Sequence, residues 1–263
     1  MKNTVILFAT ALLLAACTPM QPALSIPDTQ KKEPLPVKGR QGLLINQKLS
    51  FAEYQTGKVK RSWTKGGNSR VGVLGTQSMN GEYIDLISKE YIERKQTFSF
   101  QMSDTHNNLS DVYGASNFNA ENLLLGNNPN SVINVLEDIY GRNDFSENVF
   151  YLQVFVNDET HPWELLLDNQ ASQANKKYVG FFAKDATHYY TLQPITKLET
   201  KQGPKSTLMG SVGFEIKNPD NEVVAAVSLM DNGLVYLITD QPDERFLMAN
   251  LCAALLLQQN IAE

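Results

Sequence analysis

The stretch ERFLMANLCAALLLQQN, from Glu244 to Asn260, decides the fold. Between Phe246 and Leu257 the only polar side chain is that of Asn250. A helix made from this run is apolar on every face, and such a helix must be enclosed by other apolar groups. Either a membrane or the interior of a folded domain can enclose it.

The length of the run favours the interior of a domain. A helix from Phe246 to Leu257 reaches about 18 Å, whereas the hydrocarbon core of a bilayer is roughly 30 Å thick. Asp243, Glu244 and Arg245 prevent an extension at the upstream end. Burial of the large side chains contributes roughly 10 to 20 kcal/mol as an upper bound, comparable with the whole stability of a typical domain. The run therefore predicts a buried helix that organises the core.

Two polar details belong to this helix. Asn250 requires a hydrogen-bonding partner, because an unpaired buried amide is costly. The preceding residues predict how the helix begins, with Asp240 as a possible N-cap and Pro242, Asp243 and Glu244 in the first turn.

Most of the remaining chain predicts strands. GSVGFEIKNPDNEVVAAVSLMDNGLVYLITD, from Gly210 to Asp240, predicts three strands joined by turns at NPDN and DNG. Alternation predicts strands at RVGVLG (70–75), at QTFSFQMSD (96–104), where Phe98, Phe100 and Met102 share one face, and at PWELLLDN (162–169). NVFYLQVFVND (148–158) is apolar on both faces, which is typical of a strand covered on both sides.

Helices are predicted at FNAENLLLG (118–126) and NPNSVINVLEDIYG (128–141). Together with the apolar run, these patterns predict an α+β fold with mainly antiparallel strands. A barrel-like sheet is expected to wrap around the buried hydrophobic C-terminal helix. The alternative, in which this helix leaves the barrel to dock elsewhere, requires the rest of the chain to fold without it.

A family resemblance supports the same architecture. FEIKNPDNEVVAAV (Phe214 to Val227), the strand GLVYLI and an acid-started helix that places Ala249, Cys252, Ala253 and Ala254 among large apolar residues resemble the C-terminal part of tubby-like proteins. That group includes the LURP-one-related and scramblase-like families. The resemblance implies a twelve-stranded closed barrel around a hydrophobic C-terminal helix. The chain shows no strong counterpart of the basic residues with which true tubby proteins bind phosphoinositides, so that activity is not implied.

The N-terminus carries the features of an export signal. Lys2 is basic, Val5 to Leu14 is an uninterrupted apolar stretch, and small residues follow at Ala15 and Ala16. LAAC, from Leu14 to Cys17, resembles the lipobox of bacterial lipoproteins. The resemblance implies cleavage before Cys17, a diacylglycerol on its thiol and an acyl chain on its new amino group. Thr18 at the following position implies sorting to the outer membrane. The alternative is an ordinary secretory signal with a chance cysteine.

These features predict three parts of the chain. Residues 1–16 are expected to be a signal peptide, residues 17–41 a lipidated cysteine with a Pro-rich tether, and residues 42–263 a single globular domain. The tether is rich in Pro and poor in large apolar side chains, which predicts an extended chain that reaches up to roughly 70 Å. Cys252 lies inside the apolar run and is interpreted as a small buried hydrophobe rather than a reactive thiol.

A basic cluster is the candidate binding surface. TGKVKRSWTKGGNSR places Lys58, Lys60, Arg61, Lys65 and Arg70 around Trp63 in a chain with a net charge of -5. This surface is expected to meet anionic lipid headgroups, lipopolysaccharide phosphates or an acidic envelope protein. The alternative is a solvated strand with Trp63 in the core. The sequence has no basic patch interleaved with aromatic residues, so nothing in it indicates a nucleic-acid partner.

Catalytic patterns are weak. His106, His161 and His188 lie far apart and lack the H-E-x-x-H spacing of a zinc helix, and no G-x-S-x-G motif occurs. We therefore expect no metal site and no cofactor beyond the covalent lipid at Cys17. The sequence predicts a lipid-anchored component of the cell envelope that binds or scaffolds, facing the periplasm or the cell surface. The alternative is an envelope hydrolase that uses His106 or His161 with neighbouring carboxylates.

Overall fold

The computed structural model describes residues 20–40, 47–63, 75–77, 83–85, 96–118, 149–208 and 210–258. In chain order its elements are η1 (Asp28–Gln30), β1 (Leu35–Pro36), β2 (Ser50–Phe51), β3 (Tyr54–Thr56), β4 (Lys60–Trp63), β5 (Gly75–Gln77), β6 (Tyr83–Asp85), β7 (Gln96–Ser103), β8 (Leu109–Phe118), β9 (Val149–Val156), β10 (Trp163–Asp168), α3 (Asn169–Ala174), β11 (Gly180–Ala183), β12 (Tyr189–Pro194), β13 (Lys197–Leu198), β14 (Lys205–Ser206), β15 (Gly213–Lys217), β16 (Val223–Ser228), β17 (Leu234–Leu237) and α4 (Pro242–Leu257). The predicted helix at 128–141 lies outside the described residues. So do the predicted helix at 118–126, except for Phe118 at the end of β8, and the predicted strand at 70–75, except for Gly75.

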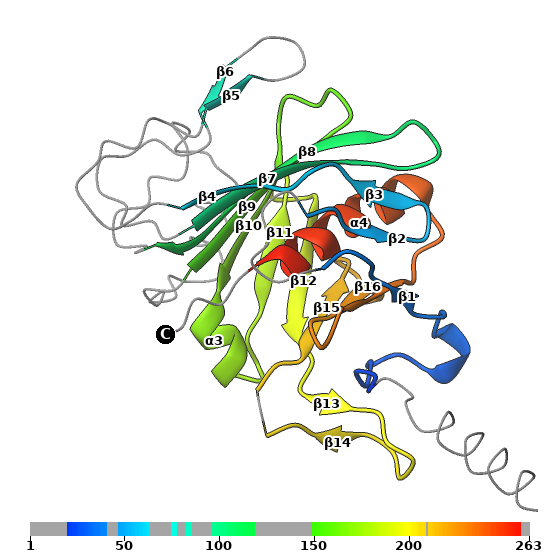
Figure 1. Ribbon diagram of the computed structural model, residues 1–263. Helices are drawn as coiled ribbons and strands as arrows, with labels where there is room; N and C mark the ends of the chain where they lie inside the picture. Colours follow the sequence, from blue (N-terminus) through cyan, green and yellow to red (C-terminus); the bar gives the residue numbers. More distant parts are fainter. Residues whose placement is uncertain are drawn as a thin grey trace, which may run out of the picture.

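One antiparallel sheet curls around α4 (Figure 1). Its strand order is β1-β17-β16-β15-β12-β11-β10-β9-β8-β7-β3-β2, and β4 also pairs with β7. The two ends of this order meet, because Lys38 and Ser50 exchange main-chain N–H···O bonds of 2.9 and 3.1 Å. The α+β class and the barrel-like sheet around the C-terminal helix are confirmed.

The two ends meet so closely that a glycine is required. Gly39 has a φ of +81°, in the region that favours glycine, and a Cβ built on it would lie 1.8 Å from the main-chain oxygen of Lys48. No side chain fits this gap, so Gly39 allows the two backbones to approach one another.

The faces of β7 follow the predicted alternation, whereas β10, for which alternation was also predicted, is buried on both faces from Glu164 to Asp168. Phe98, Phe100 and Met102 of β7 are buried in the core that surrounds α4. On β9 every residue from Val149 to Phe155 is buried, as expected for a strand covered on both faces. The predicted three-stranded meander is present as β15, β16 and β17, which pair in sequence.

Helix α4 occupies the centre of the barrel. All residues from Phe246 to Leu257 are buried, and the helix contacts β8, β9, β16 and β17. Asn250 has the partners that its burial requires: its Nδ2 donates to the carbonyl oxygen of Phe246 at 2.8 Å, and its Oδ1 accepts from the hydroxyl of Ser110 on β8. The amide therefore fixes the position of the helix relative to the sheet.

The ends of α4 differ from the prediction in one respect. Gln241, not Asp240, is the N-cap residue, and it makes no side-chain capping bond. The Asp240 carboxylate instead pairs with the ammonium of Lys32, an interaction that lowers the pKa of Asp240. Pro242, Asp243 and Glu244 do form the first turn, as predicted.

The expected tether is wrong for residues 20–40, which pack against the barrel. Leu35 and Pro36 form β1 and pair with β17, and Leu24 is buried against a small cluster on the sheet that includes Tyr236. Ser25 donates from its main-chain N–H and its hydroxyl to the Glu215 carboxylate. A few apolar side chains and main-chain bonds to the sheet suffice to order a segment whose composition indicates an extended chain.

Candidate binding site

The interior of the barrel is filled by protein. Helix α4 presents side chains of 0% exposure along its length, among them Phe246, Met248 and Leu251. A ligand-sized lumen of the kind that many β-barrels enclose is therefore replaced by the helix. Candidate sites lie on the outside of the sheet.

The line along which the sheet closes carries a row of outward lysines. Lys38 lies opposite β2, Lys48 lies two residues before β2, and Lys58 and Lys60 flank the buried Val59. All four side chains are exposed, whereas their neighbours Val37, Leu49 and Val59 face the core. We call Lys38, Lys48, Lys58 and Lys60 the lysine seam.

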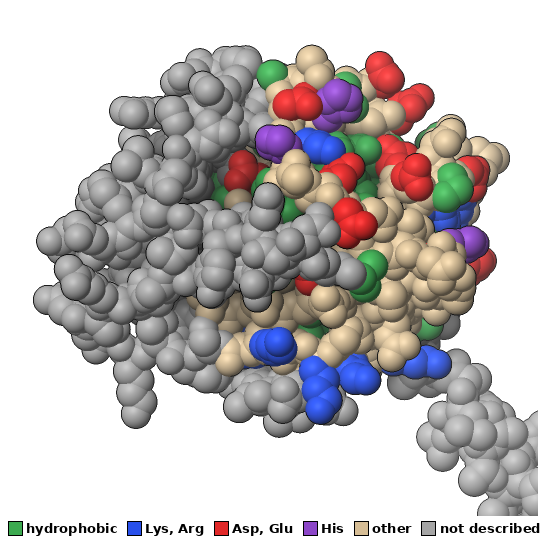
Figure 2. All heavy atoms as spheres, turned by 90° about the horizontal axis from the view of Figure 1, so that it is seen from above, with side chains coloured by type: hydrophobic (Ala, Val, Ile, Leu, Met, Phe, Trp, Pro, Cys, Tyr) green, Lys and Arg blue, Asp and Glu red, His purple; other side chains and the backbone are tan. Residues whose placement is uncertain are grey.

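Main-chain bonds hold these strands side by side. Thr56 donates to the carbonyl oxygen of Leu49, and Val59 donates to that of Gln47, each at 2.9 Å. The lysines therefore belong to one surface although they come from separate segments of the chain. Figure 2 shows Lys and Arg side chains gathered along one edge of the face in view, away from most of the visible Asp and Glu side chains.

Two members of the predicted surface, Lys58 and Lys60, have exposed side chains, but Arg61 does not share their face. The Arg61 guanidinium turns inward, donates from Nη2 to the carbonyl oxygen of Leu257 at 3.1 Å and lies 5.6 Å from the ring centroid of Phe98. Burial lowers the pKa of Arg61. Strand alternation explains the difference, because position 61 follows an outward residue on β4.

The remaining members of the predicted cluster are not placed. Trp63 ends β4, but its side chain lies outside the described part of the chain, as do Lys65 and Arg70. Lys38 and Lys48 were missed by the sequence analysis. Their alternation with buried residues is a signal that they face outward, but only the strand pairing brings them beside Lys58.

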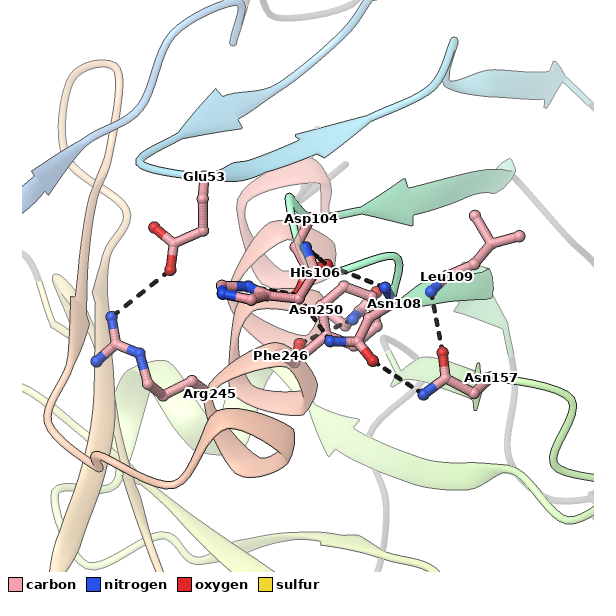
Figure 3. A network of polar contacts seen from close by, with 9 residues as sticks. All are labelled: Glu53, Asp104, His106, Asn108, Leu109, Asn157, Arg245, Phe246 and Asn250. Carbon is pink, nitrogen blue, oxygen red and sulfur yellow. Dashed lines mark hydrogen bonds and ion pairs between the residues drawn. The ribbon is translucent and has the colours of Figure 1, made fainter.

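His106 lies in the turn between β7 and β8, and its surroundings are those of a structural turn (Figure 3). Asp104 Oδ1 accepts from the main-chain N–H groups of His106 and Asn108, and Asp104 Oδ2 accepts from the Asn108 side chain at 2.8 Å. Burial would raise the pKa of Asp104, but these hydrogen bonds outweigh it and lower that pKa. The His106 ring is 73% exposed and 3.8 Å from the carboxylate. The carboxylate therefore serves the turn rather than a catalytic base.

His161 lies in the loop between β9 and β10, and two of its neighbouring carboxylates have other partners. Glu159 pairs with Lys184 at 2.8 Å. Glu164 is buried and accepts from Tyr151 Oη and Gln153 Nε2. The His161 ring contacts Thr160 Oγ1 at 3.0 Å. The structure thus brings neither His106 nor His161 together with a carboxylate in a shared pocket.

His188 and Asp185 form a local pair on the surface. Nδ1 of His188 lies 2.8 Å from the Asp185 carboxylate, which also accepts from the hydroxyl and main-chain N–H of Thr187. These interactions hold the pKa of Asp185 well below its usual value. The same carboxylate shapes the turn before β12, so the pair is a turn motif.

Metal ligation and thiol chemistry have no candidate among the residues that the structure describes. No group of three or more His, Cys, Asp or Glu residues is placed to hold a metal ion in that part of the chain. Cys252 is completely buried on α4, and burial raises the pKa of its thiol far above the usual value. The interpretation of Cys252 as a buried hydrophobe is supported. Cys17 lies outside the described residues.

A pocket of about 560 Å³ opens on the outer face of the sheet beside α3. Its residues come from the end of β10, from α3 and the loop after it, from β11 and β12, and from the turn between β15 and β16. Figure 1 shows where these elements lie in the fold. We call it the α3 pocket. Its volume falls within the range of roughly 300 to 1,000 Å³ that is typical of small-molecule sites. None of the three histidines lines it.

The comparisons with known proteins add no identity. No family model, curated protein or solved structure matches the chain. Within the described residues, no helix combines the length and the apolar character that a membrane crossing demands.

Proposed function

We propose that this chain is a lipid-anchored component of the bacterial cell envelope that binds anionic groups through the lysine seam. The observation that carries the proposal is the convergence of Lys38, Lys48, Lys58 and Lys60 on one outer surface. The anchor in this proposal is Cys17, acylated at the LAAC motif, and the location is the outer membrane.

The docking of the N-terminal segment against the barrel limits how far the barrel can lie from the anchor. The main-chain N–H of Glu199 donates to the carbonyl oxygen of Gln21, and the main-chain N–H of Ala23 donates to that of Lys197, each at 2.9 Å. Since consecutive Cα atoms are at most 3.8 Å apart, Cys17 lies within about 15 Å of Gln21. An acylated Cys17 therefore holds the barrel close to the bilayer, where phosphate-bearing headgroups are concentrated.

The electrostatics of the seam fit such a partner. Near an anionic surface each lysine contributes about 1 kcal/mol, so the seam provides about 4 kcal/mol as an upper bound. Salt weakens this attraction, because the Debye length is only about 10 Å at 0.1 M. The attraction is strong enough to orient an anchored domain but does not by itself replace the anchor.

We also propose, as a separate assignment, that the fold is related to the tubby-like barrels. The enclosure of an apolar C-terminal helix by an antiparallel sheet supports this relationship. The enzymatic alternative has less support, because the carboxylates nearest to His106 and His161 are used in turns, an ion pair and a buried network.

Vesicle binding tests the proposal. Residues 18–263, which lack the acylated cysteine, are mixed with vesicles that contain phosphatidylglycerol or only phosphatidylcholine. We expect binding to the anionic vesicles alone, lost at high salt. Replacing Lys38, Lys48, Lys58 and Lys60 with Gln should weaken it at least tenfold.

A second variant controls for net charge. Lys176, Lys197, Lys201 and Lys205 are also exposed, and none belongs to the seam. Changing these four to Gln removes the same charge and should weaken binding much less. Equal losses in the two variants would show that bulk charge, not the seam, is responsible.

A further inference from the structure

The α3 pocket combines an aromatic wall with polar groups from separate elements. Phe181 on β11 and Tyr189 on β12 lie with ring centroids 6.4 Å apart and planes inclined at 58°. Both rings are partly exposed and line the pocket. Aromatic faces of this kind pack against the apolar face of a ring in a ligand.

Two amides of the pocket, those of Asn175 and Gln193, are oriented by partners that can only donate. The main-chain N–H of Lys177 donates to Asn175 Oδ1 at 2.9 Å, and the Lys217 ammonium donates to Gln193 Oε1 at 2.9 Å. Since the oxygen of each amide is engaged, the amino groups of Asn175 and Gln193 are the donors that a ligand can use.

Tyr178 and Lys177 also favour a ligand that accepts hydrogen bonds. Tyr178 Oη accepts from the main-chain N–H of Asp168, which leaves the phenol proton to donate, and burial raises the pKa of Tyr178 so that the proton is retained. The Lys177 ammonium adds a positive charge at an exposed position. Asp168 lines the pocket as well, but its Oδ1 accepts from Ala171 as the N-cap of α3.

We propose that the α3 pocket binds an acidic sugar, meaning a saccharide ring that carries a carboxylate or a phosphate. The ring packs against Phe181 and Tyr189, and its anionic group is met by the Lys177 ammonium and the amino groups of Asn175 and Gln193. The site is separate from the lysine seam, and its occupancy does not depend on the anchor at Cys17.

Calorimetric titration of the mature full-length protein in detergent tests this site with three probes: glucuronate, glucose and inorganic phosphate. We expect glucuronate to bind with the highest affinity, because it alone offers both the ring and the anion. Lys177→Met should raise the Kd for glucuronate at least tenfold, which corresponds to about 1.4 kcal/mol.

Lys176→Met is the matched control. Lys176 is the exposed neighbour of Lys177 and does not line the pocket, so its replacement should leave the Kd for glucuronate unchanged. Equal weakening by Lys176→Met would overturn the proposal, as would the absence of saturable glucuronate binding. Phosphate or glucose binding as tight as that of glucuronate would overturn it too, because the site would then recognise only one half of the ligand.

Failure of this site leaves the proposed function intact. The vesicle assay depends on lysines outside the α3 pocket, and the titration depends on a pocket outside the seam. Loss of one result with retention of the other therefore identifies which proposal is wrong.

Discussion

Arg61 donates a hydrogen bond to the carbonyl oxygen of Leu257, 196 residues further along the chain, at 3.1 Å. Arg40 acts in the same place, because its Nε donates to the carbonyl oxygen of Leu256 at 3.0 Å. The last turn of α4 itself contains no basic residue. The carbonyl groups at the end of this buried helix are therefore satisfied by cations from the beginning of the fold.

Arg61→Met should destabilise the protein by about 1 to 2 kcal/mol. The substitution keeps most of the apolar stem but removes a charged donor from a buried carbonyl group. Urea unfolding followed by circular dichroism measures the change. Lys60→Met, at the exposed neighbouring position, should stay within about 0.5 kcal/mol of the wild type. An equal loss of stability in both variants would contradict the role of Arg61 in capping the C-terminal end of α4.

The side chains of Ser110 and Asn250 should be energetically coupled. Ser110→Ala leaves a buried amide oxygen without its hydroxyl donor, which should cost about 1 to 3 kcal/mol. In a double-mutant cycle with Asn250→Leu, we expect a coupling energy of at least about 0.5 kcal/mol. Additive effects of the two substitutions would contradict a direct interaction between the side chains.

A substitution at Leu24 distinguishes an N-terminal segment that packs against the barrel from an extended tether. Its side chain is 8% exposed and packs with Tyr236 on the outside of the sheet. Leu24→Ala should lower the free energy of unfolding by about 2 kcal/mol. Glu33→Ala, at an exposed position in the same segment, serves as the control. An unchanged unfolding midpoint for Leu24→Ala would contradict the docking of this segment and favour an extended tether.

Alkaline pH should destabilise the fold through buried tyrosines. Burial, aided by the neighbouring Glu53 carboxylate, raises the pKa of Tyr54 to about 12, and burial raises the pKa of Tyr236 to about 12. An unfolded tyrosine ionises near pH 10. Because the folded state holds the proton more tightly, stability is full below about pH 10 and falls as the pH rises toward 12.

Thermal melts between pH 8 and pH 11 measure this effect. We expect Tm to fall above about pH 10, and less steeply in Tyr54→Phe, which cannot ionise at that position. A Tm that does not change over this range, or an identical slope in Tyr54→Phe, would contradict the assignment of Tyr54 as a source of the alkaline instability.

The core was predictable because its signals are local. An apolar run such as Phe246 to Leu257 must be enclosed wherever it lies, and the alternation of Phe98, Phe100 and Met102 defines an inner face without any knowledge of strand order. The requirement of Asn250 for a partner could also be predicted, although the identity of Ser110 could not, since it depends on the strand that passes beside the helix.

The misassigned features depend on pairing between distant segments. Residues 20–40 are ordered by β17, Glu215 and the cluster around Tyr236, none of which their own composition indicates. The carboxylate of Asp240 pairs with Lys32, which lies 208 residues earlier. The α3 pocket similarly combines groups from three regions of the chain, so no short motif marks it. The inward direction of Arg61 was available from strand alternation once Lys60 was placed outside.

Intact-mass analysis of the native protein extracted from bacterial membranes tests the lipid anchor most directly. We predict a chain that begins at Cys17 and carries the added mass of a diacylglycerol and one further acyl chain, with both modifications on the N-terminal peptide. A Cys17→Ser variant should lack this mass. A native chain that begins elsewhere, or an unmodified Cys17, would contradict the anchor and with it the proposed place of the barrel beside the membrane.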